Sequence, residues 1–192
     1  MSTASVLDSA KTETSVPADD GLYEIVDGEL VEKTMSALAI WIASRLNQLL
    51  GSFVFDQGLG TVVMEMLFLL DRARNRRRRP DVAFISATTW PPNQPIPEEG
   101  DWEVVPDLAV EVVSPNDGME EVLDKVHEYF DLGVKQVWVI VPSVRQAYIY
   151  DSPTQDHIVS ADQNLEGGTL IPGWRVPLAS LFPQPESMPS PE

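Results

Sequence analysis

Residues 106–142 read PDLAVEVVSPNDGMEEVLDKVHEYFDLGVKQVWVIVP and contain the clearest indication of topology in the chain. Leu108 to Val113 and Val137 to Val141 are short apolar runs, which are typical of buried strands. Apolar residues at helical spacing between them predict a helix that ends at about Leu132, with Gly133 as its stop signal. A strand, a helix and a strand in this order predict two parallel strands joined by a crossover connection.

The segment before this unit predicts antiparallel pairing as well. Tyr23 to Val26 and Glu29 to Glu32 flank Asp27-Gly28, and Asp-Gly between two short runs is a strong hairpin signal. Apolar residues at helical spacing predict a helix from Ser36 to Leu50, which Gly51 would end. We therefore expect an α/β or α+β fold, in which helices pack on a mixed sheet that has an N-terminal β-hairpin.

Further strands are expected on both sides of the crossover unit. Phe53 to Phe55 and Thr61 to Leu70 are predicted strands, and the second is nearly all apolar, which favours a central position. The arginine-rich run that follows is predicted to be a loop. Val82 to Ile85 is a predicted buried strand, and Ala147 to Tyr150 is the expected hairpin partner of Val137 to Val141.

The composition limits the class of protein. The 192 residues include 43% apolar residues and no cysteine, which excludes disulfide scaffolds, thiolate metal sites and cysteine catalysis and fits a cytoplasmic protein. No apolar run approaches the roughly 18 residues that a membrane helix needs, so we expect no membrane-spanning segment. We expect a single domain over residues 20–182, between a flexible leader (1–19) and a flexible Pro-rich tail (183–192), and no secretory signal at the start.

Asp81, Glu111 and Lys125 are the sharpest candidates for a functional site. Asp81 follows Pro80 at the start of a predicted buried strand, and Glu111 lies within an apolar strand, where a carboxylate is costly without a partner. Two carboxylates on neighbouring strands can share a Mg²⁺ ion, which also takes water and phosphate oxygens. A nearby lysine can orient the attacking water or stabilise the charge that develops on a phosphate.

Each candidate also has a purely structural interpretation. Asp81 can be a turn residue, Glu111 can pair with an arginine of residues 72–79, and Lys125 can be a solvated lysine that pairs with an acid of its own helix. Glu65 interrupts an apolar run and is a third carboxylate candidate, or else an outward-facing residue on an edge strand.

The pieces of this sequence resemble a known family in their order and spacing. RRRRPDVAF (76–84), PDLAVEVVSPND (106–117), EEVLDKVHEYFDLGVKQVWVIVP (120–142), the opening YEIVDGELVEK (23–33) and the closing PGWRVPLASLF (172–182) are similar to the bacterial Uma2 (Uma-two) family of restriction-endonuclease-like proteins. That family is assigned to the PD-(D/E)xK nuclease fold. Each piece alone is short, so the combination carries the resemblance.

The resemblance implies roles for the candidate residues. Asp81 corresponds to the acid of the PD half and Glu111 to the acid of the (D/E)xK half, and both would be ligands of Mg²⁺ or Mn²⁺. The lysine expected two residues after the acid is missing, since Val113 stands there. Lys125, four residues before Tyr129, is the implied substitute.

The charge distribution leaves the substrate open. A net charge of −17 argues against nucleic acid, because a strongly acidic protein repels a polyanion. Six of the 13 basic residues, however, lie within residues 72–79, whereas residues 98–128 contain eleven acids and one base. Arg77, Arg78 and Arg79 can hold phosphates beside the metal, or the run can neutralise the acidic stretch.

The expected function is metal-dependent endonuclease cleavage of DNA by a homodimer, as the resemblance implies. The alternative is a catalytically inactive nuclease-fold module that acts in nucleic-acid or protein interaction, which the missing in-strand lysine and the acidity favour. A third expectation is an enzyme that acts on a small phosphorylated substrate.

Overall fold

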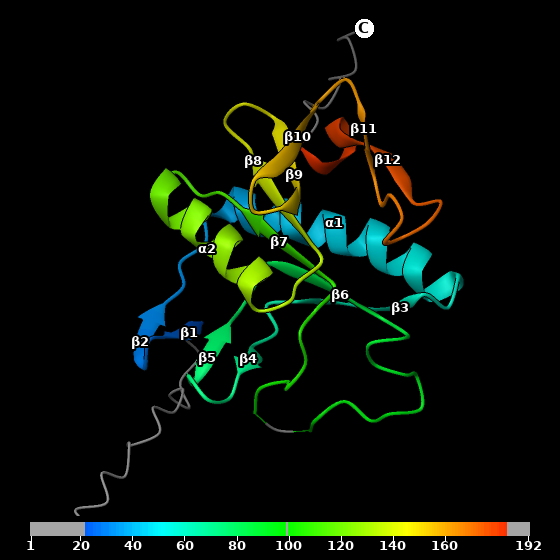
Figure 1. Cartoon of the computed structure of the whole chain (residues 1–192). Coiled ribbons are helices and arrows are strands. Elements are labelled where there is room, and N and C mark those ends of the chain that lie inside the picture. The colour runs from blue at the N-terminus through cyan, green and yellow to red at the C-terminus, as the bar shows by residue number, and fades with distance from the viewer. Residues whose placement is uncertain (1–21, 99, 184–192) are drawn as a thin grey trace, which may run out of the picture.

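The computed structural model describes residues 22–98 and 100–183, so the predicted leader (1–19) and all of the predicted tail except its first residue lie outside the described residues. A mixed sheet carries one long helix and one shorter helix, and a smaller sheet lies beside it (Figure 1). The predicted α/β class with a mixed sheet is therefore confirmed. The elements are, in chain order, β1 (Tyr23–Val26), β2 (Glu29–Glu32), α1 (Ala37–Asp56), β3 (Gly60–Met64), β4 (Phe68–Asp71), β5 (Arg76–Arg78), β6 (Val82–Ser86), β7 (Leu108–Val112), α2 (Met119–Asp131), β8 (Gln136–Val141), β9 (Gln146–Ser152), β10 (Gln155–Ser160), β11 (Asn164–Glu166), β12 (Arg175–Pro177) and the 3₁₀ helix η1 (Leu178–Leu181).

The large sheet has the strand order β10-β9-β8-β7-β6-β3. Its β7 and β8 are parallel, with Glu111 opposite Val139, and α2 connects them, which confirms the predicted crossover. The other neighbouring strands of this sheet are antiparallel, including β8 with the predicted partner β9. The helix α2 begins at Met119 with Gly118 as its N-cap, after a turn in which the Ser114 N–H donates to Asp117.

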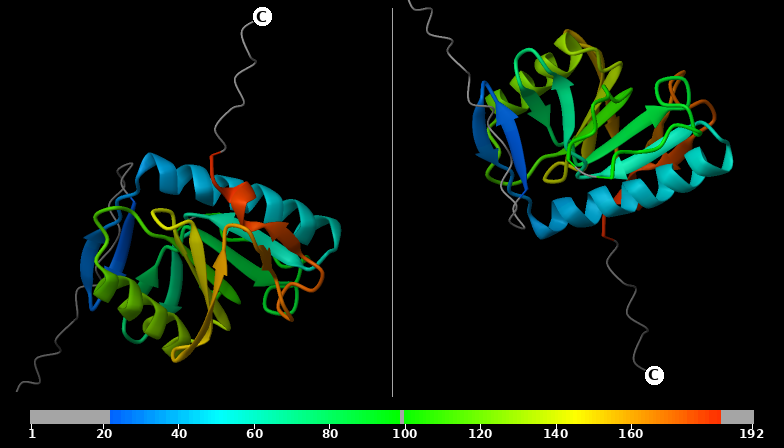
Figure 2. Two further views of the ribbon diagram at one scale, coloured as in Figure 1. Left: turned by 90° about the horizontal axis from the view of Figure 1, so that it is seen from above. Right: turned by 90° about the horizontal axis from the view of Figure 1, so that it is seen from below.

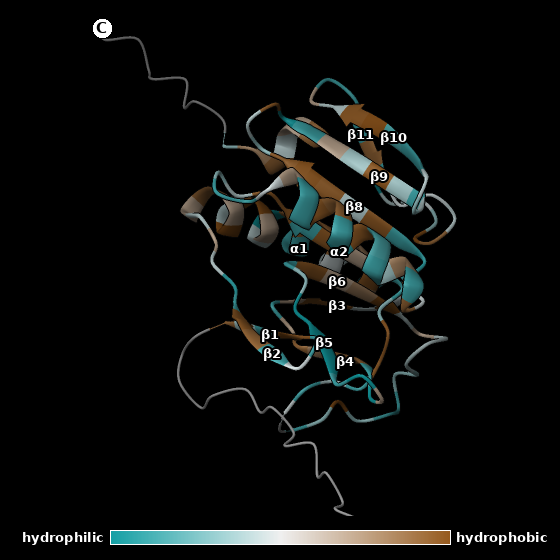
Figure 3. Ribbon diagram, turned by 60° about the vertical axis from the view of Figure 1, so that its left-hand side comes forward, coloured by the Kyte–Doolittle hydropathy of each residue, from teal (hydrophilic) through white to brown (hydrophobic). Residues whose placement is uncertain are grey.

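The two helices lie on opposite faces of the large sheet, as the two views of Figure 2 show. Residues alternate between these faces along each strand. Val82, Phe84 and Val110 pack in the core with α1, whereas Ala83 and Ala109 pack in the core with α2. Figure 3, which is coloured by hydropathy, shows that β6 and β8 of the large sheet are largely hydrophobic, whereas the short strand β5 is hydrophilic.

The smaller sheet has the strand order β2-β1-β5-β4. Its β1–β2 hairpin confirms the prediction from Asp27-Gly28, where φ is 52° and 82°. Positive φ at both central residues is what a tight type I′ hairpin turn requires. The single pairing of Ile25 with Arg77 brings this hairpin onto β5.

Two sequence predictions for residues 51–79 were wrong. Phe53 to Phe55 belong to α1, which continues past Gly51 because Leu46, Leu50 and Val54 form one buried stripe against the sheet. The arginine run is not only a loop, since Arg76–Arg78 form β5.

The predicted strand over residues 61–70 is two strands in two sheets. Glu65 separates β3 from β4 and has a φ of 49°, a conformation that turns the chain sharply and that side-chain-bearing residues seldom adopt. The first piece, β3, is an edge strand of the large sheet rather than a central one.

The helix α1 is also long and apolar enough to cross a membrane by length and composition, with a mean hydropathy of 1.3. The expectation that the chain has no membrane-spanning segment stays a prediction. Buried core helices pass the same test, and α1 contributes six buried residues to the core between helix and sheet. The finding is therefore weak support for a membrane span.

Candidate active site

The three predicted site residues line one cavity. Asp81, Glu111 and Lys125 surround a space of about 430 Å³, together with Glu24 and Lys33. The cavity lies where the N-terminal hairpin, the ends of β6 and β7, and α2 approach one another. The structure thus brings together the residues that the sequence predicted as a group.

Asp81 directly precedes β6 and is 2% exposed. Its Oδ2 accepts a hydrogen bond from the N–H of Val112 at the end of the neighbouring strand β7. Its Oδ1 lies 2.6 Å from Nζ of Lys33. Asp81 is therefore more than a turn residue, because it joins the end of a strand to a buried lysine.

Glu111 points from β7 toward α2, on the same face of the strand as Ala109. Its Oε1 accepts a 2.7 Å hydrogen bond from the hydroxyl of Tyr129, and its Oε2 lies 3.4 Å from Nζ of Lys125. Burial raises the pKa of Glu111 and the nearby carboxylate of Asp81 raises it further, while Lys125 opposes the shift. Its partners are thus a lysine and a tyrosine, not an arginine of residues 72–79.

Lys125 reaches the cavity from α2 and is 23% exposed at its side chain. Its Nζ lies 3.4 Å from Glu111 and 3.4 Å from Glu24, rather than pairing with an acid of its own helix. Burial would lower the pKa of Lys125, but Glu111 and Glu24 raise it well above its ordinary value. The ammonium group is therefore charged at neutral pH and lies between two carboxylates.

Glu24 and Lys33 are site residues that the sequence analysis missed. Glu24 is 2% exposed, and although burial would raise its pKa, Lys125, Arg78 and the Arg79 N–H lower it below its ordinary value. Burial would lower the pKa of Lys33, but the three carboxylates of Asp81, Glu111 and Glu65 raise it. A glutamate next to the apolar Ile25 in a hairpin strand was the available signal for Glu24.

Glu65 also belongs to this charged cluster. Its carboxylate lies 3.0 Å from Nζ of Lys33 and is 19% exposed, so it is not an outward-facing residue. Burial and the carboxylate of Asp81 raise the pKa of Glu65 to about 7, against the opposing effect of Lys33. Its participation in chemistry remains a prediction.

The arginines of β5 and its neighbour Arg79 are engaged within the chain. Arg77 pairs with Asp101, and the buried Arg78 pairs with Glu24 at 2.9 Å and with Glu128. The guanidinium group of Arg79 donates to the backbone carbonyls of Tyr23 and Glu65. Asp101 and Glu128 belong to the acidic stretch 98–128, so these contacts are those expected if the run neutralises that stretch. Phosphate binding by Arg77, Arg78 and Arg79 stays a prediction.

The donor atoms suit a hard divalent cation. Asp81 and Glu111 offer carboxylate oxygens beside an open cavity, and Mg²⁺ requires only one or two protein carboxylates when water completes its shell. Within residues 22–98 and 100–183, no three His, Cys, Asp or Glu side chains form a metal cluster of their own. The fit is therefore to a site with two protein carboxylates and coordinated water, not to one formed by protein ligands alone.

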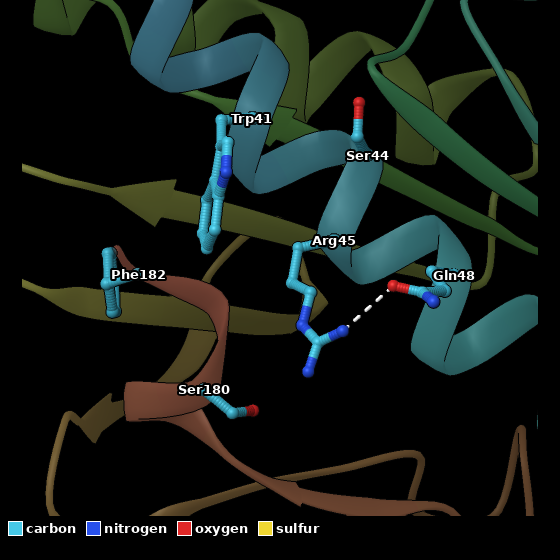
Figure 4. Close-up of a pocket in the computed structure, with 6 residues that line it drawn as sticks. All are labelled: Trp41, Ser44, Arg45, Gln48, Ser180 and Phe182. Atoms are coloured by element: carbon cyan, nitrogen blue, oxygen red, sulfur yellow. Dashed lines mark hydrogen bonds between the residues drawn. The ribbon is translucent and has the colours of Figure 1, made fainter. Parts of the chain in front are cut away.

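A second cavity lies elsewhere, between α1 and the segment around η1 (Figure 4). It measures about 490 Å³ and is lined by Trp41, Arg45 and Phe182 among others. Arg45 donates a 2.8 Å hydrogen bond to Gln48 there. Among the described residues, none that lines it carries a carboxylate, so it lacks the donors that the first cavity offers.

Comparisons with known proteins identify the family and the fold of the chain. The family model Uma2, described as "Putative restriction endonuclease", matches residues 14–179. No curated protein matches the sequence. A crystal structure described as a "putative nuclease belonging to DUF820" from Anabaena variabilis superposes with a TM-score of 0.72 at 17% identity, and the match covers 87% of this chain and 93% of that one. That match shows a shared fold, and the extent of the family match shows that the chain belongs to the Uma2 family.

Proposed function

We propose that the protein is a metal-dependent nuclease that hydrolyses phosphodiester bonds in DNA. The observation that carries the proposal is the convergence of Asp81, Glu111 and Lys125 on one cavity, from β6, β7 and α2. Membership of a family described as "Putative restriction endonuclease" and the fold shared with a protein described as a "putative nuclease" support it.

Asp81 and Glu111 would hold the metal ion. When bound, Mg²⁺ or Mn²⁺ lowers the pKa of a coordinated water and offsets charge on a phosphate. Lys125 is held by Glu111 and Glu24 at the cavity and keeps 23% of its side chain exposed, so its ammonium group can donate to a phosphate oxygen or orient the attacking water. Tyr129 fixes the orientation of Glu111 through its hydroxyl.

The charge of the protein does not favour the approach of DNA to the site. The net charge is −17, and the arginines nearest the site are paired with carboxylates or bonded to backbone carbonyls. Binding to DNA is therefore expected to be weak and to fall as salt concentration rises. A homodimer, as implied by the resemblance, is part of the proposal and would present two sites to one duplex; light scattering at several protein concentrations tests it.

Calorimetric titration with Mn²⁺ tests the metal site. The native protein is expected to bind Mn²⁺, and Asp81→Asn is expected to remove this binding while the circular dichroism spectrum stays native. Binding that persists in Asp81→Asn would show that the metal site lies elsewhere.

A second function is favoured by the ion pairs themselves. The carboxylates of Asp81, Glu65 and Glu111 each contact a lysine, which is the arrangement of a structural charge network. A non-catalytic interaction module with the nuclease fold would have such a network. Absence of both Mn²⁺ binding and DNA cleavage would favour this module.

A further inference from the structure

The ammonium group of Lys33 lies in a cage of oxygen atoms. Its Nζ is 2.6 Å from Oδ1 of Asp81, 3.0 and 3.1 Å from the two carboxylate oxygens of Glu65, and 2.7 Å from the carbonyl oxygen of Arg79. Carboxylate and carbonyl oxygens of this kind are also the donors that hard divalent cations take in proteins. The lysine therefore occupies a site whose donors suit a metal ion.

We propose that Lys33 is a resident cation that closes the metal site at Asp81 and must leave the oxygen cage before a divalent ion can bind. This inference rests on the proposed function, since it takes Asp81 as a metal ligand. Oδ2 of Asp81 accepts the N–H of Val112, so Oδ1 is the oxygen left for a cation, and Lys33 holds it. Two cations cannot share this position without strong repulsion.

The surroundings of Lys33 allow it to move. Lys33 lies in the connection between β2 and α1, and its side chain, 7% exposed, lines the cavity of about 430 Å³. Its backbone N–H donates to the carbonyl of Leu22 at 2.8 Å, which anchors the main chain. A four-carbon side chain can then turn its ammonium group into the cavity without a change of fold.

The backbone of Glu65 positions its carboxylate within this cage. Its φ of 49° is rare for a residue with a side chain and carries a conformational cost. The turn directs the Glu65 carboxylate at Lys33 and the Glu65 carbonyl at Arg79. The strained residue thus supplies a second carboxylate to the site of Asp81.

Binding of Mn²⁺ to matched variants, measured by electron paramagnetic resonance of the free ion, tests the inference. Lys33→Met keeps the length of the side chain and removes its charge. Lys135→Met is the control, because Lys135 also pairs with a buried aspartate, Asp107, and its loss changes the net charge equally. Lys33→Met is expected to bind Mn²⁺ at least about tenfold more tightly than the native protein, because the competing charge is gone. Lys135→Met is expected to bind as the native protein does.

The outcomes separate this inference from the proposed function. Tighter binding in Lys33→Met that disappears in Lys33→Met combined with Asp81→Asn supports it. Equal Mn²⁺ affinity in the native protein and Lys33→Met, dependent on Asp81 in both, overturns the inference and leaves the nuclease proposal standing. No binding in either contradicts both.

A measurement on the native protein covers the case in which Lys33→Met does not fold. The sequence contains four lysines, at positions 11, 33, 125 and 135, so a protein labelled with ¹³C-lysine gives few side-chain signals. Saturation with diamagnetic Mg²⁺ is expected to shift the Cε–Hε signal of Lys33 and leave that of Lys135 unchanged. A Lys33 signal that stays in place while Mg²⁺ binds overturns the inference.

Discussion

The hydroxyl of Tyr129 donates a 2.7 Å hydrogen bond to Oε1 of Glu111, and both side chains are buried between α2 and β7. Burial raises the pKa of the tyrosine, as does the neighbouring carboxylate, so the hydroxyl keeps its proton and remains a donor. This contact fixes one oxygen of Glu111, while Lys125 approaches the other. The orientation of Glu111 in the cavity therefore depends on α2.

Tyr129→Phe is expected to lower the free energy of unfolding by about 1–3 kcal/mol, because an acceptor of Glu111 is left buried without its donor. Chemical denaturation measures this loss. The same variant is expected to weaken Mn²⁺ binding, since the carboxylate is no longer held in one orientation. Unchanged stability would show that Glu111 finds another donor.

Lys125→Met is expected to reduce DNA cleavage about 100-fold or more, because a positive donor at the cavity is lost. Lys125→Arg, which keeps the charge but changes its geometry, is expected to recover part of the activity. Initial rates at saturating Mn²⁺ measure both. Full activity in Lys125→Met would assign the lysine role to another residue, with Lys33 as the other lysine that lines the cavity.

Arg78→Ala is expected to destabilise the fold by about 3–5 kcal/mol, because the buried Glu24 loses an ion-pair partner. Arg175→Ala removes an exposed pair with Glu166 and is expected to cost less than about 1 kcal/mol. Urea denaturation of the two variants gives the comparison. Equal losses would mean that the buried pair of Arg78 and Glu24 contributes no more to stability than the exposed pair of Arg175 and Glu166.

Glu65→Gln is expected to change the pH dependence of stability. A carboxylate whose pKa is raised in the folded state from 4.5 to about 7 holds its proton more tightly there than in the unfolded chain. Its contribution to stability is complete below pH 4.5 and is lost as the pH rises through about 7. The melting temperature of the native protein should therefore fall, relative to that of Glu65→Gln, between these pH values. Parallel curves would contradict the raised pKa.

Local sequence patterns were sufficient for the central part of the fold. The apolar runs of residues 106–142 and their helical spacing correspond to β7, α2 and β8, and Asp27-Gly28 marks the first hairpin correctly. These features depend on neighbours in sequence, which periodicity and turn chemistry describe well.

The remaining part of the site depends on contacts between distant residues. Glu24 and Lys33 reach the cavity because β1 pairs with β5 through Ile25 and Arg77, and no local pattern encodes that pairing. The reversal at Glu65 depends on one residue with positive φ inside an apolar run, where periodicity alone predicts a continuous strand. The charge pairs of the arginines follow from the same long-range arrangement.

Cleavage of a labelled DNA duplex by the native protein and by Asp81→Asn, each with Mn²⁺ and with EDTA, tests the proposed function most directly. Cleavage is predicted for the native protein with Mn²⁺ alone, and it should be absent in EDTA and in Asp81→Asn. Cleavage that persists in EDTA, or that is equal in Asp81→Asn, would contradict a metal-dependent site at Asp81.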